Sequence, residues 1–213
     1  MLVNNKFIFV IFSVLLTLIG LKTAMAVKTA PPILGNYARQ LLDVQHWDEM
    51  YESERQKDVN YLLGSIDEKS LPNLNEQQKD QVVSMMRSMA ITQLLKDKSY
   101  FKGYLIEQYT HAFTQDEFMK LIDYFKTDLM QTMIKAKIDH QEIKIEELNF
   151  KLTSQTPPDK KITDWFNGSY LNARYARFQE DITPKLNTMI YERSKQVLTA
   201  VFNEIPVLVK SVS

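Results

Sequence analysis

The sequence predicts an all-α fold: a single-domain bundle of about five to seven helices behind a cleaved signal peptide. Apolar residues recur at helical spacing along most of the chain. No stretch alternates strictly between apolar and polar residues, as a half-buried strand does. Only 5 of the 213 residues are glycine, which disfavours a turn-rich β fold. Together these three observations favour helices throughout.

The first 26 residues resemble a secretory signal peptide. Lys6 precedes an apolar run over residues 7–21, and Ala24 and Ala26 form the A-x-A pattern that signal peptidase recognises. The apolar run is shorter than the roughly 20 residues that a membrane-spanning helix needs. We therefore expect cleavage after Ala26 and a periplasmic mature protein. The alternative is an uncleaved anchor.

The mature chain divides into three predicted parts: an extended lead-in over 27–35, a helical domain over 36–206 and a C-terminal tail over 207–213. Within the domain, Asn36 can cap a first helix whose apolar stripe continues to Gly64. Residues 65–74 form a connection.

The next helices are predicted from caps and breaks. Asn75 and Gln78 occupy the N-cap and N3 positions of a helix whose apolar stripe ends at Leu94. The polar cluster over 96–99 predicts a break or kink, and helical spacing resumes over 100–112.

The strongest local pattern is a capping box at Thr114 and Glu117. The Thr114 side chain can accept from the Glu117 backbone N–H, and the Glu117 carboxylate can accept from the Thr114 N–H. Phe113 and Phe118 occupy the positions of a hydrophobic staple, and Asp116 adds negative charge to the first turn. We expect a helix that buries Phe118 and the following apolar residues.

Two further helical patterns complete the domain. A weaker one covers 139–154 and ends before Pro157. A long one runs from Ile162 to Pro206, with Pro184 in its interior. Because proline has no N–H to donate, Pro184 predicts either a kink or a new helix start.

Composition excludes several functions. The absence of cysteine excludes disulfides, thiolate catalysis and cysteine metal sites. Without Lys6 and Lys22, 24 basic and 26 acidic side chains leave a formal charge of −2. This balance gives no electrostatic basis for binding nucleic acid. No segment after the signal peptide is long and apolar enough to span a membrane, and no glycine-rich phosphate loop or serine nucleophile motif is present.

Histidines and paired carboxylates give no catalytic or metal site. The chain has three histidines, His46, His111 and His140. His46 and Glu49 have the spacing of metal ligands on a helix, but no second histidine accompanies them. The adjacent pairs over 116–117, 146–147 and 180–181 point about 100° apart on a helix and do not face each other. We predict no cofactor and no metal.

The richest local feature is a series of aromatic residues with interleaved arginines. Bulky side chains on more than one helix face indicate either a helix buried among its neighbours or a surface that binds a partner. A ligand groove between helices is a third interpretation. The candidate partner-binding residues are Trp165, Phe166, Tyr170, Arg174, Tyr175, Arg177 and Phe178.

The run from Phe113 to Thr127, FTQDEFMKLIDYFKT, resembles the core motif of the bacterial domain-of-unknown-function family 2059. In members of the family this motif starts with Phe-Thr/Ser-x-x-Glu. An apolar helix follows, and the motif ends with aromatic residues, then Lys or Arg, then Ser or Thr. A Gly-Gln-Lys run usually follows; this chain keeps Gln131 but lacks the glycine. The resemblance covers about residues 80–140. It implies an exported helical protein and transfers no activity or functional residue.

These observations predict a non-enzymatic periplasmic protein that acts by contact with an unidentified envelope protein. The partner would be an envelope assembly component or a toxin that the protein neutralises. The alternatives are a hydrolase of peptidoglycan or another envelope polymer, with Glu49 or Glu117 as the residue to test, and a small-ligand-binding helical protein.

Overall fold

The computed structural model describes residues 32–64, 71 and 74–212, and these residues confirm the all-α prediction. No strand occurs among them. The signal peptide lies outside the described residues. The helices are α2 (Pro32–Val44), α3 (Trp47–Leu63), α4 (Glu76–Lys96), α5 (Lys98–Ala112), α6 (Gln115–Phe125), α7 (Asp128–Ile138), α8 (Ile145–Thr153), α9 (Pro157–Gly168), α10 (Tyr170–Asn203) and α11 (Ile205–Val212).

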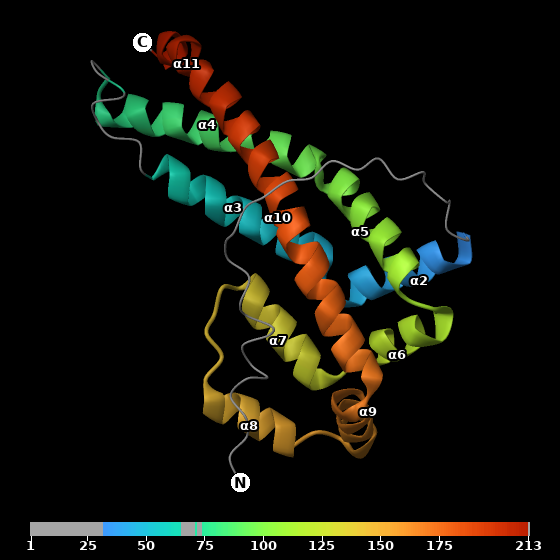
Figure 1. Cartoon of the computed structure of the whole chain (residues 1–213). Coiled ribbons are helices and arrows are strands. Elements are labelled where there is room, and N and C mark those ends of the chain that lie inside the picture. Colours follow the sequence, from blue (N-terminus) through green and yellow to red (C-terminus); the bar gives the residue numbers. More distant parts are fainter. Residues whose placement is uncertain (1–31, 65–70, 72–73, 213) are drawn as a thin grey trace.

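The long helix α10 organises the molecule. Figure 1 shows it running from α9 at one end to α11 at the other, past α3, α4 and α5. Its N-terminal half contributes Leu171, Phe178 and Ile182 to one cluster of buried residues, and its C-terminal part contributes Val197 and Val201 to a second. A single helix therefore connects two cores.

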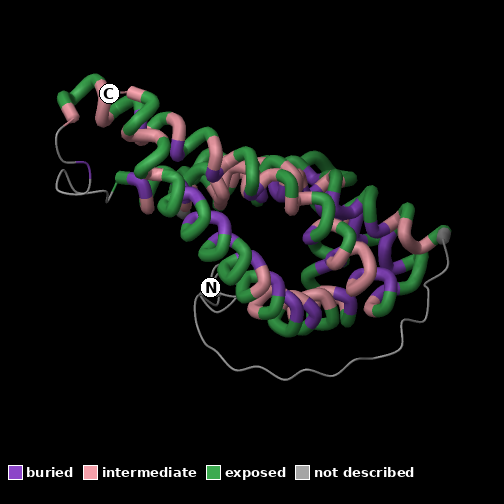
Figure 2. The backbone as a smooth tube through the Cα atoms, turned by 90° about the horizontal axis from the view of Figure 1, so that it is seen from above, coloured by how far each residue is buried: buried purple, intermediate pink, exposed green. Residues whose placement is uncertain are grey.

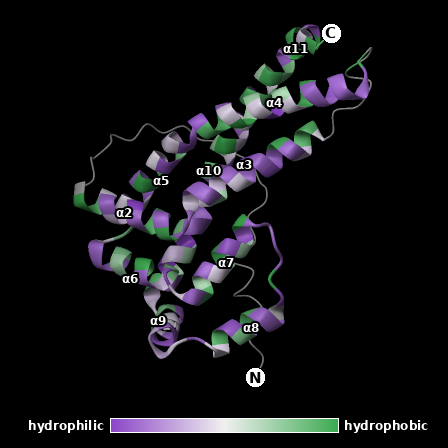
Figure 3. Ribbon diagram, turned by 180° about the vertical axis from the view of Figure 1, so that it is seen from behind, coloured by the Kyte–Doolittle hydropathy of each residue, from purple (hydrophilic) through white to green (hydrophobic). Residues whose placement is uncertain are grey.

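The first cluster, here called the large core, is formed mainly by α2, α5, α6 and the N-terminal half of α10, with the start of α3, α7 and α9 at its borders. The second, the small core, is formed by the end of α3, α4 and the C-terminal part of α10. Side chains of α11 pack against the small core, although none is fully buried. Figure 2 shows buried positions concentrated away from the C-terminal end, and Figure 3 shows apolar residues along α11.

Both predicted capping boxes are present. At the start of α6, Thr114 Oγ1 accepts from the Glu117 N–H at 3.4 Å, and Glu117 Oε2 accepts from the Thr114 N–H at 2.8 Å. Asn75 and Gln78 make the same reciprocal pair at the start of α4. The predicted staple is also present, because the Phe113 and Phe118 rings meet edge to face with centroids 6.0 Å apart.

The first predicted helix was wrong at both ends. It begins at Pro32 rather than after Asn36, so part of the expected lead-in is helical. It also ends at Val44, because His46 adopts a left-handed backbone conformation with φ 51° before α3 begins. A left-handed residue cannot continue a right-handed helix, and Asn or His at such a position gives no strong sequence signal.

The predicted break over 96–99 is confirmed: α4 ends at Lys96 and α5 begins at Lys98. At Pro184, α10 continues through the proline without a new start, and the alternative of a kink stays a prediction. Ile182 and Leu186 on either side are buried, so tertiary contacts hold the helix together despite the missing hydrogen bond.

The number and extent of the C-terminal helices also required correction. The described residues contain more than the five to seven helices expected, partly because the long C-terminal pattern is divided at Ser169 and Glu204. The predicted tail over 207–213 is wrong as far as residue 212, since these residues lie in α11. Pro206 occupies the first turn of that helix, where proline is tolerated.

Candidate functional site

A buried carboxylate lies where α6 meets the start of α10. Glu117, the N3 residue of α6, has only 3% of its surface exposed. Its Oε2 atom accepts from both the Thr114 N–H at 2.8 Å and the Thr114 hydroxyl at 3.0 Å. The capping box thus places this side chain beneath the surface with one oxygen fully occupied.

The other oxygen of Glu117 holds two side chains of α10. Arg174 Nη1 donates to Oε1 at 2.7 Å, and the Tyr170 hydroxyl donates to the same atom at 3.2 Å. Arg174 Nη2 also donates to the Ala112 carbonyl, and its guanidinium lies 5.6 Å from the centroid of the Phe113 ring. The first turns of α10 are therefore fixed to the α5–α6 junction.

The electrostatics keep Glu117 ionised. Burial alone would raise its pKa, but hydrogen bonds from Thr114, the charge of Arg174 and the Tyr170 hydroxyl together hold the pKa below its usual value. In return, the Glu117 carboxylate raises the pKa of the Tyr170 hydroxyl. An ionised carboxylate whose acceptor positions are filled does not suit the role of a general acid in bond cleavage.

Exposed side chains surround the buried Glu117 carboxylate. Tyr170 is 64% exposed and Trp165 on α9 is 41% exposed. The Lys120 ammonium on α6 lies 5.2 Å from the centroid of the Trp165 ring, and the adjacent Met119 is 49% exposed. We call the set Met119, Lys120, Trp165, Tyr170 and Arg174 the α6–α9–α10 surface.

Part of the predicted partner-binding set lies in the large core instead. Phe166 is buried and stacks on Tyr124 with ring centroids 3.8 Å apart, and Phe178 packs against Tyr109 and Phe113. These two rings are not accessible to a partner, because α9 and α10 direct them toward the neighbouring helices. Arg177, by contrast, is exposed.

Tyr175 is half-buried against the large core, and its hydroxyl joins a polar network that sequence reasoning missed. Gln45 Nε2 donates to the Tyr175 hydroxyl at 2.8 Å, and Gln179 Nε2 donates to the Tyr109 hydroxyl at 2.8 Å. The two hydroxyl oxygens are 3.5 Å apart. Burial raises the pKa of both tyrosines, so the network is neutral. It satisfies polar groups in the core and offers no exposed reactive atom.

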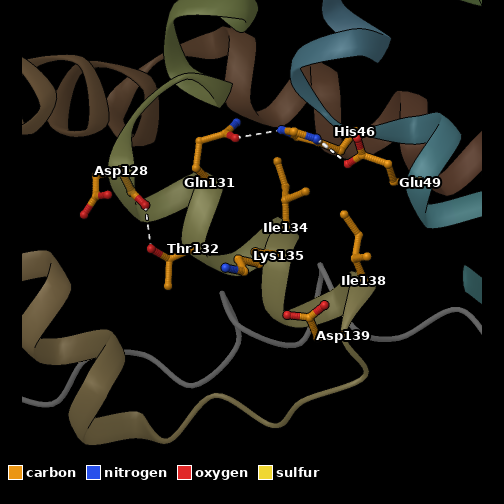
Figure 4. Close-up of a pocket in the computed structure, with 9 residues that line it drawn as sticks. All are labelled: His46, Glu49, Asp128, Gln131, Thr132, Ile134, Lys135, Ile138 and Asp139. Carbon is orange, nitrogen blue, oxygen red and sulfur yellow. Dashed lines mark hydrogen bonds and ion pairs between the residues drawn. The ribbon is translucent and has the colours of Figure 1, made fainter.

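A depression of about 480 Å³ lies between the start of α3 and the length of α7. Figure 4 shows its lining, and Ile134 and Ile138 form the apolar part. The complete lining is His46, Glu49, Asp128, Gln131, Thr132, Ile134, Lys135, Ile138 and Asp139. His46 Nδ1 lies 2.5 Å from Glu49 Oε2, so the two residues singled out by their spacing do meet.

The side chains of this depression do not converge on one point. His46 Nε2 is occupied by Gln131 Oε1 at 3.0 Å, and Asp128 pairs with Lys151 at 2.9 Å. In the part of the chain that the structure describes, no three His, Asp or Glu residues are grouped so that they could hold a metal ion. The arrangement around His46 joins helices rather than enclosing a ligand.

None of the three adjacent carboxylate pairs named from the sequence forms a buried pair. Glu117 is buried, whereas Asp116 is exposed. The pairs over 146–147 and 180–181 lie on exposed helix surfaces.

No protein-family model, curated protein or solved structure matches the chain. The resemblance to family 2059 therefore stays a prediction. Over residues 32–64, 71 and 74–212, no helix has both the length and the apolar character to cross a bilayer.

Proposed function

We propose that this protein acts by binding another protein through the α6–α9–α10 surface. The observation that carries the proposal is the immobilisation of exposed Tyr170 and Arg174 by buried Glu117. Tyrosine, tryptophan and arginine are the residue types that concentrate binding energy at protein interfaces. Trp165 on α9 and Tyr170 and Arg174 on α10 occur together here.

Preorganisation favours this surface over the other exposed aromatic residues. A side chain that is already held loses little conformational entropy when a partner binds. Tyr170 and Arg174 are held by Glu117, and Trp165 is covered on one face by Lys120. The free aromatic face of Trp165 and the ring of Tyr170 then provide rigid, amphipathic contact area.

The proposed setting is the periplasm, and the proposed partner is an envelope protein: an assembly component or a toxin that this protein neutralises. The setting rests on the signal-peptide pattern of residues 1–26. The mass of the protein recovered from a periplasmic fraction tests it. We expect an N-terminus at Val27; an intact N-terminus in the membrane fraction would show that residues 7–21 act as an anchor.

Affinity capture from an envelope extract, with crosslinking, tests the binding proposal. We expect Tyr170→Ala and Trp165→Ala to reduce recovery of the crosslinked partner strongly. Tyr191→Ala is the matched control, since Tyr191 lies on the same helix as Tyr170 and has nearly the same exposure, 65% against 64%. Equal losses in all three variants would contradict a specific surface. Cleavage of wall material in a gel assay, lost on changing Glu49, would replace the proposal by the hydrolase alternative.

A further inference from the structure

Two histidines connect α3 to α7, one near each end of α7. His46 precedes α3, and its Nε2 lies 3.0 Å from Gln131 Oε1 in the first turn of α7. His140 follows α7, and its Nε2 lies 3.0 Å from Ser53 Oγ on α3. Among the described residues they are the only non-glycine residues with positive φ, 51° and 52°. The same left-handed backbone conformation thus occurs at both ends of the contact between α3 and α7.

The protons at His46 can be assigned from its partners. Gln131 Nε2 donates to the carbonyls of Val44 at 2.9 Å and Phe125 at 2.6 Å. This orientation of the amide makes Gln131 Oε1 an acceptor, so His46 Nε2 must carry a proton to bond it. His46 Nδ1 faces the Glu49 carboxylate at 2.5 Å, another acceptor. Only the doubly protonated imidazole can donate to both.

The same reasoning applies at His140. The Ser53 hydroxyl donates to the Ile138 carbonyl at 2.6 Å, so Ser53 Oγ accepts from His140 Nε2. His140 Nδ1 lies 3.8 Å from Glu54 Oε1. Again one nitrogen faces a neutral acceptor and the other faces a glutamate of α3. At 3.8 Å the second contact is an ion pair and not a hydrogen bond, so the imidazolium makes both contacts and the neutral ring keeps only the bond to Ser53.

At His46, loss of the second proton therefore places the two acceptors in competition. A neutral imidazole has a single N–H, and a carboxylate is a stronger acceptor than an amide or hydroxyl oxygen. At His46 the proton retained on Nδ1 for Glu49 leaves an unprotonated Nε2 opposite Gln131 Oε1, which is repulsive. The contact between His46 and Gln131 is the one that joins the start of α3 to α7.

The part of the fold that depends on these contacts is limited. Met130 and Ile134 anchor α7 in the large core, but the following residues 135–139 are exposed or half-buried. Helix α8 has its main contact with α7, to which the ion pair between Lys151 and Asp128 also ties it. Loosening of the His140 contact would thus release the C-terminal part of α7. Loosening of the His46 contact would weaken the hold on the first turn of α7, to whose Asp128 helix α8 is tied.

We propose that His46 and His140 form a pH-sensitive latch that holds the α7–α8 segment on α3 when both imidazoles are protonated and loosens when they are neutral. Histidine is the side chain whose charge ordinarily changes between pH 5 and 8. The latch is closed in a mildly acidic compartment and loosens above neutral pH. This device is independent of the α6–α9–α10 surface.

Other charged groups near the two rings do not reverse this direction. Besides Glu49, the charged residues that line the same depression as His46 are Asp128 and Lys135 of α7 and Asp139 at its C-terminal end, two acidic and one basic. Near His140, Asp58 of α3 pairs with Arg55 at 3.0 Å. Burial is the main influence on the pKa of Asp58 and raises it, while the neighbouring charge of His140 lowers it.

Hydrogen exchange of the protein at about pH 5.5 and about pH 8 tests the latch, with intrinsic exchange rates corrected for pH. We expect the protection of residues 135–153 to fall about threefold to tenfold at the higher pH, the size expected of two solvent-accessible charged contacts. Protection in α4 should not change. Unchanged protection of residues 135–153 across this range would overturn the proposal.

Three variants make the test specific. His46→Asn with His140→Asn should abolish the pH-dependent difference, and asparagine tolerates the left-handed backbone at both positions. Glu49→Gln with Glu54→Gln keeps both histidines and should also abolish the difference, because the carboxylates that face the two rings are gone. His111→Gln is the control, since the ion pair that His111 makes among the described residues lies within α5, with Glu107 at 4.0 Å. A pH dependence that survives in the first two variants, or disappears in the third, would contradict the latch.

Discussion

The two cores of the molecule are built from different side chains. The large core contains ten buried aromatic residues, whereas the buried residues of the small core are aliphatic: valine, leucine, methionine and alanine. The large core also encloses polar networks around Glu117 and around Tyr175, with bond partners on several helices. Aromatic rings and buried hydrogen bonds restrict geometry more than aliphatic contacts do. The large core is therefore the region suited to hold a surface in fixed shape, and the α6–α9–α10 surface lies on it.

The largest expected effect is the loss of a ring from the large core. Phe118 is fully buried, and Phe118→Ala should lower the free energy of unfolding by about 3–5 kcal/mol. Met86→Ala is the counterpart in the small core, where Met86 is also fully buried, with an expected loss of about 2–5 kcal/mol. Denaturant titrations followed by two probes would show whether both substitutions move one transition. A second transition in either variant would mean that the two cores unfold separately.

The next effect concerns the buried carboxylate and its pH dependence. Glu117→Gln should cost about 1–3 kcal/mol at neutral pH, because Arg174 loses its charged acceptor. Since the pKa of Glu117 is lowered in the folded protein, its contribution is complete above the usual carboxyl range near pH 4.3 and is lost as the pH falls through the folded pKa. The stability difference between wild type and variant should thus shrink below about pH 4. A difference that grows on acidification would contradict this assignment.

The two capping boxes allow a matched comparison of the regions. Thr114→Ala at the start of α6 and Asn75→Ala at the start of α4 each remove one acceptor, at a cost of roughly 0.5–2 kcal/mol. Thr114 additionally donates to buried Glu117, whereas the Asn75 box is exposed. We expect the Thr114 variant to have the lower midpoint of thermal unfolding. Equal midpoints would show that the hydroxyl bond to Glu117 adds nothing.

The smallest effect should come from Asp116→Ala. Asp116 is exposed in the first turn of α6, where it acts mainly on the helix dipole, so a loss of about 0.3–1 kcal/mol is expected. The order of unfolding midpoints is then Phe118, Thr114 and Asp116, from the most to the least destabilised. If Asp116→Ala were neutral in stability but abolished partner binding, the residue would belong to the binding surface.

Local patterns were predictable from the sequence, and contacts between distant segments were not. The box at Thr114, the staple of Phe113 with Phe118 and the break near Asp97 depend on neighbouring residues and were confirmed. The break at His46 was missed because a left-handed histidine has no clear sequence signal and its side-chain partner, Gln131, is 85 residues away.

The candidate surface could also be predicted only in part, because it depends on contacts between distant segments. Tyr170, Arg174 and Trp165 were selected from their residue types, but Phe166 and Phe178 were selected with them. Helical spacing cannot tell which side of α9 or α10 faces the core when bulky residues occupy several sides. The role of Glu117 as the anchor of Arg174, 57 residues later, has no local signal at all.

Helix α10 is continuous and contributes to both cores, so it couples them mechanically. Its 34 residues span about 50 Å at 1.5 Å per residue, so its two ends move together as long as the helix stays straight. Pro184 lies near the middle, and the hydrogen bond missing there makes it the point of lowest bending stiffness. If the C-terminal part of α10 were displaced relative to its anchored N-terminal turns, we expect the helix to bend first at Pro184.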